Sequence, residues 1–553
     1  MRLGVEVGGT FTDLVAIGED GITVTKVPSV PLQPDEGAFN ALIQSQIPIP
    51  SIEELSHGST VATNAVLERK GFPTAFVTTR GFRDILRLQR HGRSRIYDLE
   101  YVKPEPVVAR AACYEVSERI LADGSIQSRL DTDQVRQELV PELHSGGYQA
   151  VAICLLNAYV NPVHEEALAE LLAAELPNLR VSLSSRVTRE FREFERASTT
   201  ALSAYVQPVV ERYIDRFVKR LESEGFTGRF SVMQSNGGRL PAEAMQSSAV
   251  TALLSGPAAG VIGATRQLGR SGYQNLITFD MGGTSTDVCM VTEGKAQLTQ
   301  EYSIDGLPIR IPLIDIHTIG AGGGSVIWVD DGGMLRIGPQ SSGADPGPAC
   351  YGRGGQLPTL TDAHLIRNTV RPEAFLGGRM EIFSDRSRAA LQPVAERLGM
   401  SLEDAADSAI QLANANVVRA IQLISTERGF DPRDYVPVPF GGAGPLHAAS
   451  VASDLGVSQV VVPPSAGVIS AFGLIASDFT QFSSLTRRVM VDEQAPKLLR
   501  ETYAAMQNEA LAKFQILKLK GDPVFDFVAD MRFVGQAFEV PVSFDVDSLE
   551  TLT

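Results

Sequence analysis

An acid, a Gly-Gly pair and a Thr-x-Thr-Asp stretch occur together twice in this chain. The first copy lies in residues 3–17 (LGVEVGGTFTDLVAI) and the second in residues 277–291 (ITFDMGGTSTDVCMV). In each copy two apolar runs flank the glycines, a pattern that is typical of a β-hairpin. Glycine lets a backbone approach a ligand closely, and successive N–H groups in such a turn bind anions. Recurrence of the pattern in register favours two phosphate-binding hairpins over two ordinary glycine turns.

The residue types within the repeat predict how it would hold a polyphosphate. Threonine hydroxyls add hydrogen-bond donors to those of the turn. A carboxylate before the glycines repels phosphate, so Glu6 and Asp280 are predicted to hold a Mg²⁺ through water. Asp13 and Asp287 either act as catalytic residues that orient the threonines and the water shell of the metal, or only stabilise their turns. The predicted phosphate contacts are Gly8, Gly9, Thr10, Thr12, Gly282, Gly283, Thr284 and Thr286.

Composition and charge exclude several classes of protein. The 553 residues carry a formal net charge of −16 and a pI near 5.1, which disfavours binding to nucleic acid or to an anionic membrane through a basic surface. No apolar run is long enough to span a bilayer. The four cysteines are far apart, without a CxxC pair, so we expect no disulfides and a reducing, cytoplasmic compartment. Cys154 and Cys289 lie in apolar runs and are predicted to be buried.

The hydrophobic pattern alternates between strands and helices, which indicates an α/β fold. Pro208 interrupts a long amphipathic stretch at residues 191–225 and is expected to break or kink it into two helices. Residues 457–462, which precede two prolines, have the pattern of a strand. Further strands are expected at 22–27, 74–78, 150–155, 181–185, 231–234, 436–440, 532–534 and 539–544, and helices at 36–43, 61–70, 132–143, 255–264 and 402–429.

The two hairpins, together with GGAG at residues 441–444, resemble the phosphate-1, phosphate-2 and adenosine motifs of the actin, sugar kinase and Hsp70 ATPase superfamily. Longer strings resemble the hydantoinase A/5-oxoprolinase family, in order over nearly the whole chain. Similar proteins commonly carry Asp where this chain has Glu6, which keeps the charge and adds one methylene. The strings include HGSTVATNAVLERKG (57–71), EFERASTTALSAYVQP (193–208), LSGPAAGVIGA (254–264), DIHTIGAGGGS (315–325) and RFVGQAFEV (532–540).

The resemblance implies a fold and a domain organisation. The expected fold is α/β, with two related ribonuclease H-like (actin-like ATPase) domains, a nucleotide cleft between them and a partial C-terminal region that contains β-structure. The N-terminal domain is expected at residues 1–190, the ATPase domain at 191–490 and the start of an incomplete C-terminal domain at 491–553. In the adenosine motif, the turn that packs against adenosine would be formed by Gly441, Gly442 and Gly444.

The resemblance also implies a chemistry. ATP and Mg²⁺ are the expected cofactors. The expected reaction is the ATP-dependent ring opening of a cyclic amide or imide, such as a hydantoin or 5-oxoproline, by phosphoryl activation of the carbonyl oxygen. The chain would be the ATP-binding subunit of a two-part, oligomeric enzyme with a hydantoinase B-type companion. Two alternatives stay open: a subunit of an ATP-dependent ketone carboxylase, and a non-enzymatic actin-like assembly module.

Three further residues are candidates for catalysis. Asp315 and His317 are two positions apart, so on a strand both would point to one face. There they could ligate a metal, serve as base and electrophile, or form a structural pair. His57 opens the HGST loop and is either catalytic or a packing residue. The basic stretch RHGRSR at residues 90–95 is a solvated loop or a contact for an anionic substrate or subunit. Without GxSxG or HExxH, a serine or zinc hydrolase is not favoured.

Overall fold

The computed structural model describes the whole chain except residues 20, 31–32, 91, 94, 518, 520 and 546–553. The chain folds into two compact units, each made of two stretches of sequence. Unit 1 contains both copies of the repeat, and unit 2 includes a segment inserted between them. The domain boundaries predicted near residues 190 and 490 stay a prediction. Unit 1 consists of Met1–Phe72 with Tyr205–Asp478, and unit 2 of Pro73–Ala204 with Phe479–Thr553.

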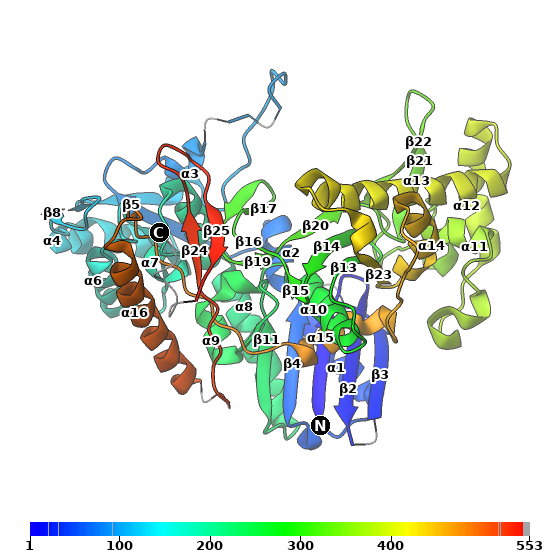
Figure 1. Cartoon of the computed structure of the whole chain (residues 1–553), viewed down its shortest axis with the longest axis horizontal. Coiled ribbons are helices and arrows are strands. Elements are labelled where there is room, and N and C mark those ends of the chain that lie inside the picture. Colours follow the sequence, from blue (N-terminus) through cyan, green and yellow to red (C-terminus); the bar gives the residue numbers. More distant parts are fainter. Residues whose placement is uncertain are drawn as a thin grey trace. The chain divides into compact units, whose positions relative to one another are not determined.

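A six-stranded sheet in unit 1 is built on the first repeat (Figure 1). In sheet order its strands are β12 (Arg239–Pro241), β11 (Arg229–Met233), β4 (Glu54–Ser59), β1 (Arg2–Val7), β2 (Phe11–Gly18) and β3 (Gly21–Pro28). The Gly-Gly turn reverses the chain after β1, so β1, β2 and β3 form an antiparallel meander. β4 lies parallel to β1, and β11 lies parallel to β4.

The second repeat builds a sheet with the same plan. In sheet order its strands are β15 (Lys295–Ala296), β14 (Thr286–Thr292), β13 (Leu276–Met281) and β23 (Val436–Phe440), and β20 (Ile316–Ile319) also pairs with β14. β13, β14 and β15 run antiparallel, whereas β23 lies parallel to β13. A meander whose first strand has a parallel neighbour is therefore present twice. This confirms the predicted α/β fold with two related domains.

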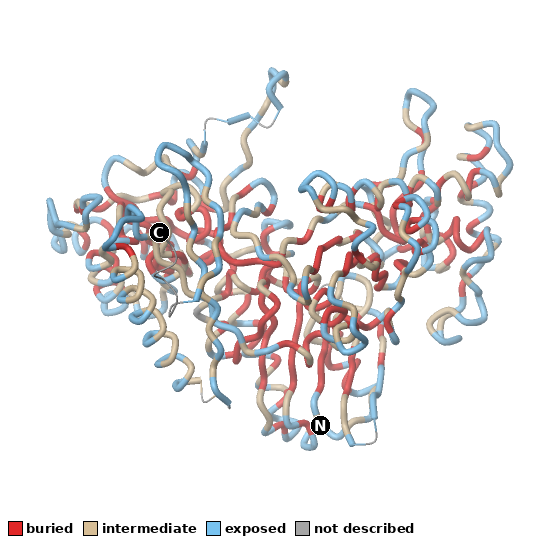
Figure 2. Tube along the Cα trace, viewed as in Figure 1, coloured by how far each residue is buried: buried red, intermediate tan, exposed pale blue. Residues whose placement is uncertain are grey.

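Two helices of unit 1 pack between its first and second sheets, namely α10 (Ser255–Gly269) and α15 (Ile469–Ala476). Small residues bring their backbones together, because a Cβ atom on Gly473 would lie 1.9 Å from the Ala259 carbonyl oxygen. Both helices contribute to one apolar cluster with β13, β14 and β23. Ala471 and Ile475 of α15 also pack against Val15 of the first sheet. The strands beneath these helices are largely buried (Figure 2).

Other helices cover the opposite faces of the two sheets. Phe39 of α1 (Pro34–Ser45) and Phe217 of α8 (Glu193–Ser223) meet edge to face against the first sheet, and α13 (Leu402–Ile424) packs on the second. The remaining elements of unit 1 are α2 (Val61–Leu67), α9 (Ala242–Ser247), β16 (Leu298–Thr299), β17 (Tyr302–Ile304), β18 (Leu307–Ile309), β19 (Leu313–Ile314), β21 (Ser325–Val329), β22 (Leu335–Ser341), α11 (Leu360–Ile366), α12 (Ser384–Leu398) and α14 (Gly444–Leu455).

Unit 2 is built on a parallel four-stranded sheet. Its order is β10 (Arg180–Leu183), β9 (Ala150–Cys154), β5 (Thr74–Thr79) and β6 (Cys113–Val116). Such a sheet needs crossover helices, and the sequence supplies them after each strand. The other elements are α3 (Ile85–Leu88), β7 (Arg119–Ile120), β8 (Ile126–Ser128), α4 (Thr132–Gln134), α5 (Val140–Ser145), α6 (Val163–Glu175), α7 (Ser184–Val187), α16 (Ala495–Ile516), β24 (Val528–Met531) and β25 (Val540–Ser543).

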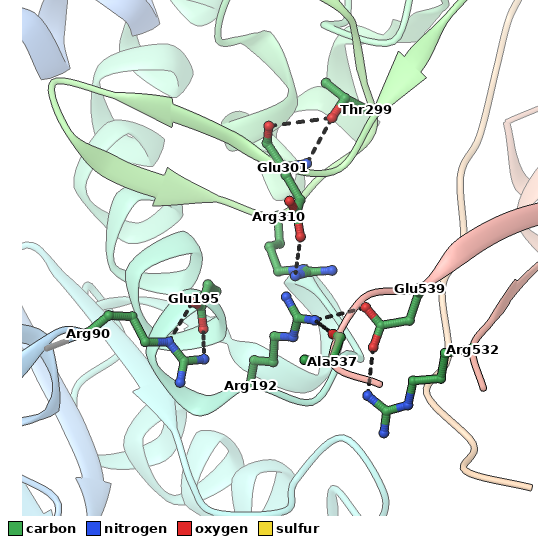
Figure 3. A network of polar contacts seen from close by, with 9 residues as sticks. All are labelled: Arg90, Arg192, Glu195, Thr299, Glu301, Arg310, Arg532, Ala537 and Glu539. Atoms are coloured by element: carbon green, nitrogen blue, oxygen red, sulfur yellow. Dashed lines mark hydrogen bonds and ion pairs between the residues drawn. The ribbon is translucent and has the colours of Figure 1, made fainter. Parts of the chain in front are cut away.

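Ion pairs join the two sequence stretches of unit 2. Arg192, just before α8, donates to the Ala537 carbonyl at 3.0 Å and to Glu539 at 2.8 Å (Figure 3). Glu539 also accepts from Arg532 at 3.0 Å. One carboxylate thus holds two guanidinium groups and fixes the segment before β25 against the start of α8.

Three local predictions are wrong. α8 runs unbroken through Pro208, because buried side chains before and after the proline outweigh the loss of one backbone hydrogen bond. Residues 457–462 form no strand. Val461 donates to the Pro437 carbonyl at 3.1 Å, but the next bond of a parallel ladder would need an N–H from Pro439, which has none. Residues 532–534 follow β24 and enter a turn in which Gln536 N–H donates to the Phe533 carbonyl at 3.0 Å.

All four cysteines are buried free thiols, which confirms the predicted burial of Cys154 and Cys289. Across the described residues, no helix combines the length and the apolar character that crossing a membrane requires.

Candidate functional site

A row of four residues crosses the first sheet directly below its Gly-Gly turn. The register pairs Gly58 with Glu6, Glu6 with Asp13 and Asp13 with Lys26. Residues paired across neighbouring strands point to the same face, so the two acids and the lysine share one side of the sheet. Lys26 Nζ donates to Asp13 Oδ1 at 2.6 Å. The glycine leaves room for the longer acid, because a Cβ atom on Gly58 would lie 1.8 Å from Glu6 Oε2.

The second sheet has an equivalent row, in which two acids are again paired at the centre. The register pairs Phe440 with Asp280, Asp280 with Asp287 and Asp287 with Thr318. Thr318 donates its hydroxyl to Asp287 Oδ1 at 2.6 Å. Each aspartate of the Thr-x-Thr-Asp stretch therefore has a partner on the next strand. That partner is a cation in the first copy and a neutral hydroxyl in the second.

The two Gly-Gly turns have the same backbone geometry and lie close together. Gly8 N–H donates to the Phe11 carbonyl and Gly282 N–H to the Ser285 carbonyl, each at 3.1 Å. A Cβ atom on Gly283 would lie 2.9 Å from Thr10 Oγ1, which places the tip of the first hairpin against the tip of the second. The fold thus brings together the two motifs that lie far apart in the sequence.

The threonines of the repeat divide into two groups. Thr12 and Thr286 are buried, and their hydroxyls bond within the protein: Thr12 to Ser29, which donates to the Gly8 carbonyl at 2.7 Å, and Thr286 to the Ala321 carbonyl. They hold the backbone around the turns. Thr284 is exposed and Thr10 is half-buried. Their hydroxyls are therefore the two in the repeat that can meet a ligand at the hairpin tips.

The glycine loop at residues 320–324 supports the second hairpin. Gly323 N–H donates to the Gly282 carbonyl at 2.9 Å, and Gly324 N–H donates to the Gly283 carbonyl at 2.6 Å. A Cβ atom on Gly322 would lie 2.8 Å from the Gly283 carbonyl oxygen, so the close approach requires glycine. The loop therefore supports the second Gly-Gly turn from behind.

Burial raises the pKa of all four acids, so the free site disfavours having all of them ionised at once. Burial, and then repulsion from Asp13 and Asp280, raises the pKa of Glu6 to about 8. Burial and the charge of Asp287 raise the pKa of Asp280 to about 7, and burial raises the pKa of Asp287 to about 6. Burial also raises the pKa of Asp13, although Lys26 opposes that rise. The charge of Asp280 acts on Glu6, and the charge of Asp13 acts on Asp280, so each row affects an acid of the other.

These acids fit a Mg²⁺ ion that keeps most of its water. Glu6 Oε2 is buried without a hydrogen-bond partner, which leaves a carboxylate oxygen free for a cation or its water. Within the described part of the chain, no three or more His, Cys, Asp or Glu side chains group as a ready-made metal site. Mg²⁺ is commonly bound through one or two carboxylates plus phosphate oxygens, so this donor set suits it.

The GGAG turn after β23 adjoins the second acid row. Gly441 has φ +79°, and a Cβ atom there would lie 2.2 Å from Asp280 Oδ1. Ala443 N–H donates to the Met281 carbonyl at 2.9 Å, which locks the turn onto β13. Gly442 is exposed and nothing lies within 4 Å of the place of its Cβ, whereas Gly444 begins α14. An open glycine beside the acids suits the close approach of a nucleotide.

Comparison with known proteins decides the family. The hydantoinase/oxoprolinase family matches residues 196–482, and the hydantoinase/oxoprolinase N-terminal region matches residues 2–176. The chain belongs to the hydantoinase/oxoprolinase family. Caprolactamase subunit alpha of Pseudomonas jessenii is 34% identical over 99% of this chain and 81% of its own length. 5-oxoprolinase 1 of Arabidopsis thaliana is 34% identical over 86% of this chain but only 41% of its own length.

Solved structures of this family have the same fold. The crystal structure of ATP-dependent caprolactamase from Pseudomonas jessenii superposes with a TM-score of 0.87 at 32% identity. Nucleotide-free acetone carboxylase superposes with a TM-score of 0.80 at 26% identity. Each comparison covers 100% of this chain and 83% of the other.

In this member of the hydantoinase/oxoprolinase family, His57 lies away from the acids. It pairs with Val5, so its ring occupies the face of the sheet opposite Glu6. The residue is fully buried, its Nε2 lies 2.7 Å from the Tyr213 hydroxyl, and its ring stacks on Phe217. Burial lowers the pKa of His57 to about 4, so the imidazole is neutral. These contacts favour the packing role.

Asp315 and His317 are also separate from the acid rows. His317 pairs with Val288, on the face of the second sheet opposite Asp287. Asp315 forms an ion pair with Arg428, which follows α13. The structure therefore favours a structural role for Asp315, and the pair does not join Glu6 or Asp280.

Sequence reasoning missed the partners of the two aspartates. Lys26 lies in no motif, and Thr318 lies in the string at 315–325 without being singled out there. The pairing of each with its aspartate follows only from the register of β3 and β20. A signal was nevertheless present for Lys26. A short turn after Gly18 sets β3 antiparallel to β2, and counting back along both strands places Lys26 opposite Asp13.

Proposed function

We propose that this chain is the ATP-binding subunit of an enzyme that opens a cyclic amide or imide ring by phosphorylating its carbonyl oxygen. The observation that carries the proposal is the convergence of the two hairpin tips, with Thr10 beside Gly283. Backbone N–H groups of both turns would bind the phosphates. Glu6 and Asp280 would hold Mg²⁺ through water, and the bound ion would neutralise charge on the phosphate oxygens.

The proposed chemistry suits such a site. An amide oxygen is a poor leaving group, and its phosphorylation makes it a good one. The carbonyl oxygen attacks the terminal phosphorus of ATP and ADP departs. Water then adds to the activated carbon and the C–N bond breaks as the nitrogen takes a proton. A second water releases phosphate and leaves a carboxylate. Phosphoryl transfer depends on positioning and charge neutralisation rather than on covalent help from the protein, and two opposed turns would supply both.

The similar proteins support this reaction class. Caprolactamase and 5-oxoprolinase are named for cyclic amides, and the caprolactamase structure is described as ATP-dependent. The similarity to acetone carboxylase favours a second candidate, a subunit of an ATP-dependent ketone carboxylase. The two candidates differ in one requirement, because only a carboxylase consumes bicarbonate.

We also propose a hydantoinase B-type companion subunit. Similar proteins are named as subunits, including the gamma subunit of acetophenone carboxylase. In unit 2, hydrogen bonds of 2.6 Å from Gln89 to the Pro104 carbonyl and from Lys103 to the Leu88 carbonyl close a loop at its base. Within residues 95–102 of that loop, which we name the apolar loop, Tyr97 and Leu99 are 97% and 98% exposed. A companion would cover these side chains. The free cysteines are consistent with a reducing, cytoplasmic location.

Calorimetric titration of the intact chain with Mg-ATP tests the nucleotide site. We expect tight, Mg²⁺-dependent binding that Asp280→Ala removes, because the substitution deletes one of the two facing acids. A panel of caprolactam, 5-oxoproline, hydantoin and acetone with bicarbonate, each with the companion subunit, then identifies the reaction by ADP release. A folded chain that binds no ATP would contradict the proposal. ADP release that requires bicarbonate would select the carboxylase.

A further inference from the structure

Lys26 is a cation inside the acid rows, and no motif marks it. Its Nζ donates to Asp13 Oδ1 at 2.6 Å and to the Gly467 carbonyl at 3.1 Å, and lies 5.2 Å from the centre of the Phe11 ring. Its charge also reaches the second row, where it lowers the pKa of Asp280 against the rise caused by burial. Among the described residues whose charges shift the pKa values of the four acids, Lys26 is the only cation.

The two copies of the repeat differ in the residue that pairs with the aspartate. In the first sheet the strand next to Asp13 supplies Lys26, whereas in the second sheet the strand next to Asp287 supplies Thr318. A row that served only to stabilise its hairpin would need no charge, as the second row demonstrates with a hydroxyl. The lysine therefore gives the first hairpin a property that the second lacks, which is attraction for an anion.

Lys26 also links the three nucleotide motifs. It binds Asp13 of the first hairpin and acts on Asp280 of the second. Its second acceptor, Gly467, follows Ala466, whose carbonyl accepts the Gly441 N–H of the GGAG turn at 3.1 Å. The ammonium thus lies where all three motifs meet within unit 1.

The ammonium retains a donor for a ligand. A lysine carries three N–H donors, and Asp13 and Gly467 accept two of them. The Lys26 side chain is 18% exposed, so it is not sealed inside the protein. We propose that Lys26 is a further binding residue of the phosphate site, and that its ammonium contacts the polyphosphate of the bound nucleotide. This inference rests on the proposed ATP site.

The test compares ATP binding by three variants of the intact chain at two salt concentrations. Lys26→Met removes the charge, Lys26→Arg keeps it, and Lys295→Met removes the same charge from exposed β15, the third strand of the second sheet. A positive charge a few ångströms from phosphate interacts strongly in a partly buried site, so we expect Lys26→Met to weaken Mg-ATP binding by about tenfold or more at low salt. The loss should shrink at high salt because screening weakens the wild-type contact.

Lys26→Arg should bind Mg-ATP within about threefold of the wild type, because it keeps the charge. Lys295→Met should match the wild type, because Lys295 is exposed and pairs with Thr292, at the end of β14 away from the Gly-Gly turn. Equal Mg-ATP binding by Lys26→Met and the wild type would overturn the role of Lys26 and leave the proposed function intact. So would a loss that is the same at both salt concentrations and that arginine does not restore, because that pattern indicates a structural role. A folded wild-type chain that binds no ATP would overturn the proposed function and the role of Lys26 with it. Melting temperatures establish that each variant is folded.

Discussion

At the scale of single residues, the site is defined by charge that the fold holds away from water. Four carboxyl groups lie in two rows, and burial raises the pKa of each. Such an arrangement destabilises the free protein and becomes favourable when a cation binds, because the cation stabilises the ionised forms. Strain of this kind is typical of a binding site rather than of a structural core.

Glu6→Gln tests this destabilisation. The pKa of Glu6 rises from 4.5 to about 8 on folding, so the folded chain holds its proton more tightly than the unfolded chain. Stability therefore falls as pH rises from about 4.5 to about 8, by at most roughly 1.4 kcal/mol per pH unit. Glutamine cannot ionise. We expect the free energy of unfolding of Glu6→Gln, measured in urea without Mg²⁺, to match the wild type near pH 5 and to exceed it by a few kcal/mol at pH 8. A difference that does not change with pH would contradict the buried charge.

His57→Phe separates packing from catalysis. The ring of His57 is neutral and stacked among aromatic side chains, and phenylalanine keeps that stacking while removing the hydrogen bond to Tyr213. We expect a loss of about 1 kcal/mol in stability from the deleted hydrogen bond to the buried Tyr213 hydroxyl. Mg-ATP affinity should be unchanged, because the ring lies on the face opposite Glu6. A folded variant that has lost ATP turnover would restore the catalytic interpretation.

At the scale of elements, local sequence patterns predicted most of the hairpins and helices. The remaining elements depend on which distant segments pair or pack with each other. The apolar runs and glycines of the repeat give both hairpins directly, and β23 has the predicted bounds. The continuity of α8 depends on packing at both sides of Pro208, and the absent strand at 457–462 depends on which neighbour it meets. The ion pair between Asp315 and Arg428 could not be predicted either, because the two residues are far apart in the sequence and nothing in one segment indicates the other.

The crossing of α10 and α15 gives a sharp test of one such long-range contact. In Gly473→Ala the new methyl group would meet the Ala259 carbonyl oxygen at 1.9 Å, and backbone cannot move aside as a flexible side chain can. We expect a loss of about 3 kcal/mol or more, measured by urea unfolding. Gly269→Ala, at the end of α10, is the control: nothing lies within 4 Å of its Cβ, and alanine favours helix by up to about 1 kcal/mol. Equal stability of the two variants would contradict the close crossing.

At the scale of the whole molecule, the two repeats belong to one unit although a stretch of unit 2, Pro73–Ala204, is inserted between them. The first sheet takes β4 from before the insertion and β11 from after it, so reading along the chain cannot reveal that these strands are neighbours. Unit 2 shares neither hairpin. Its exposed apolar loop therefore offers a surface that contains neither Gly-Gly turn, and we expect a companion subunit to bind there.

The apolar loop provides the test of that companion. Tyr97 and Leu99 are almost fully exposed, and burying each in an interface would contribute roughly 1.5 kcal/mol or more. The double variant Tyr97→Ser/Leu99→Ser should therefore weaken association with a co-expressed hydantoinase B-type subunit by about a hundredfold, measured by analytical ultracentrifugation. Ile126→Ser, on exposed β8 of the same unit, controls for the loss of apolar surface and should associate normally. ATP binding by the isolated double variant should equal that of the wild type, because the acids and both turns lie in unit 1. Undiminished association would show that the companion binds elsewhere.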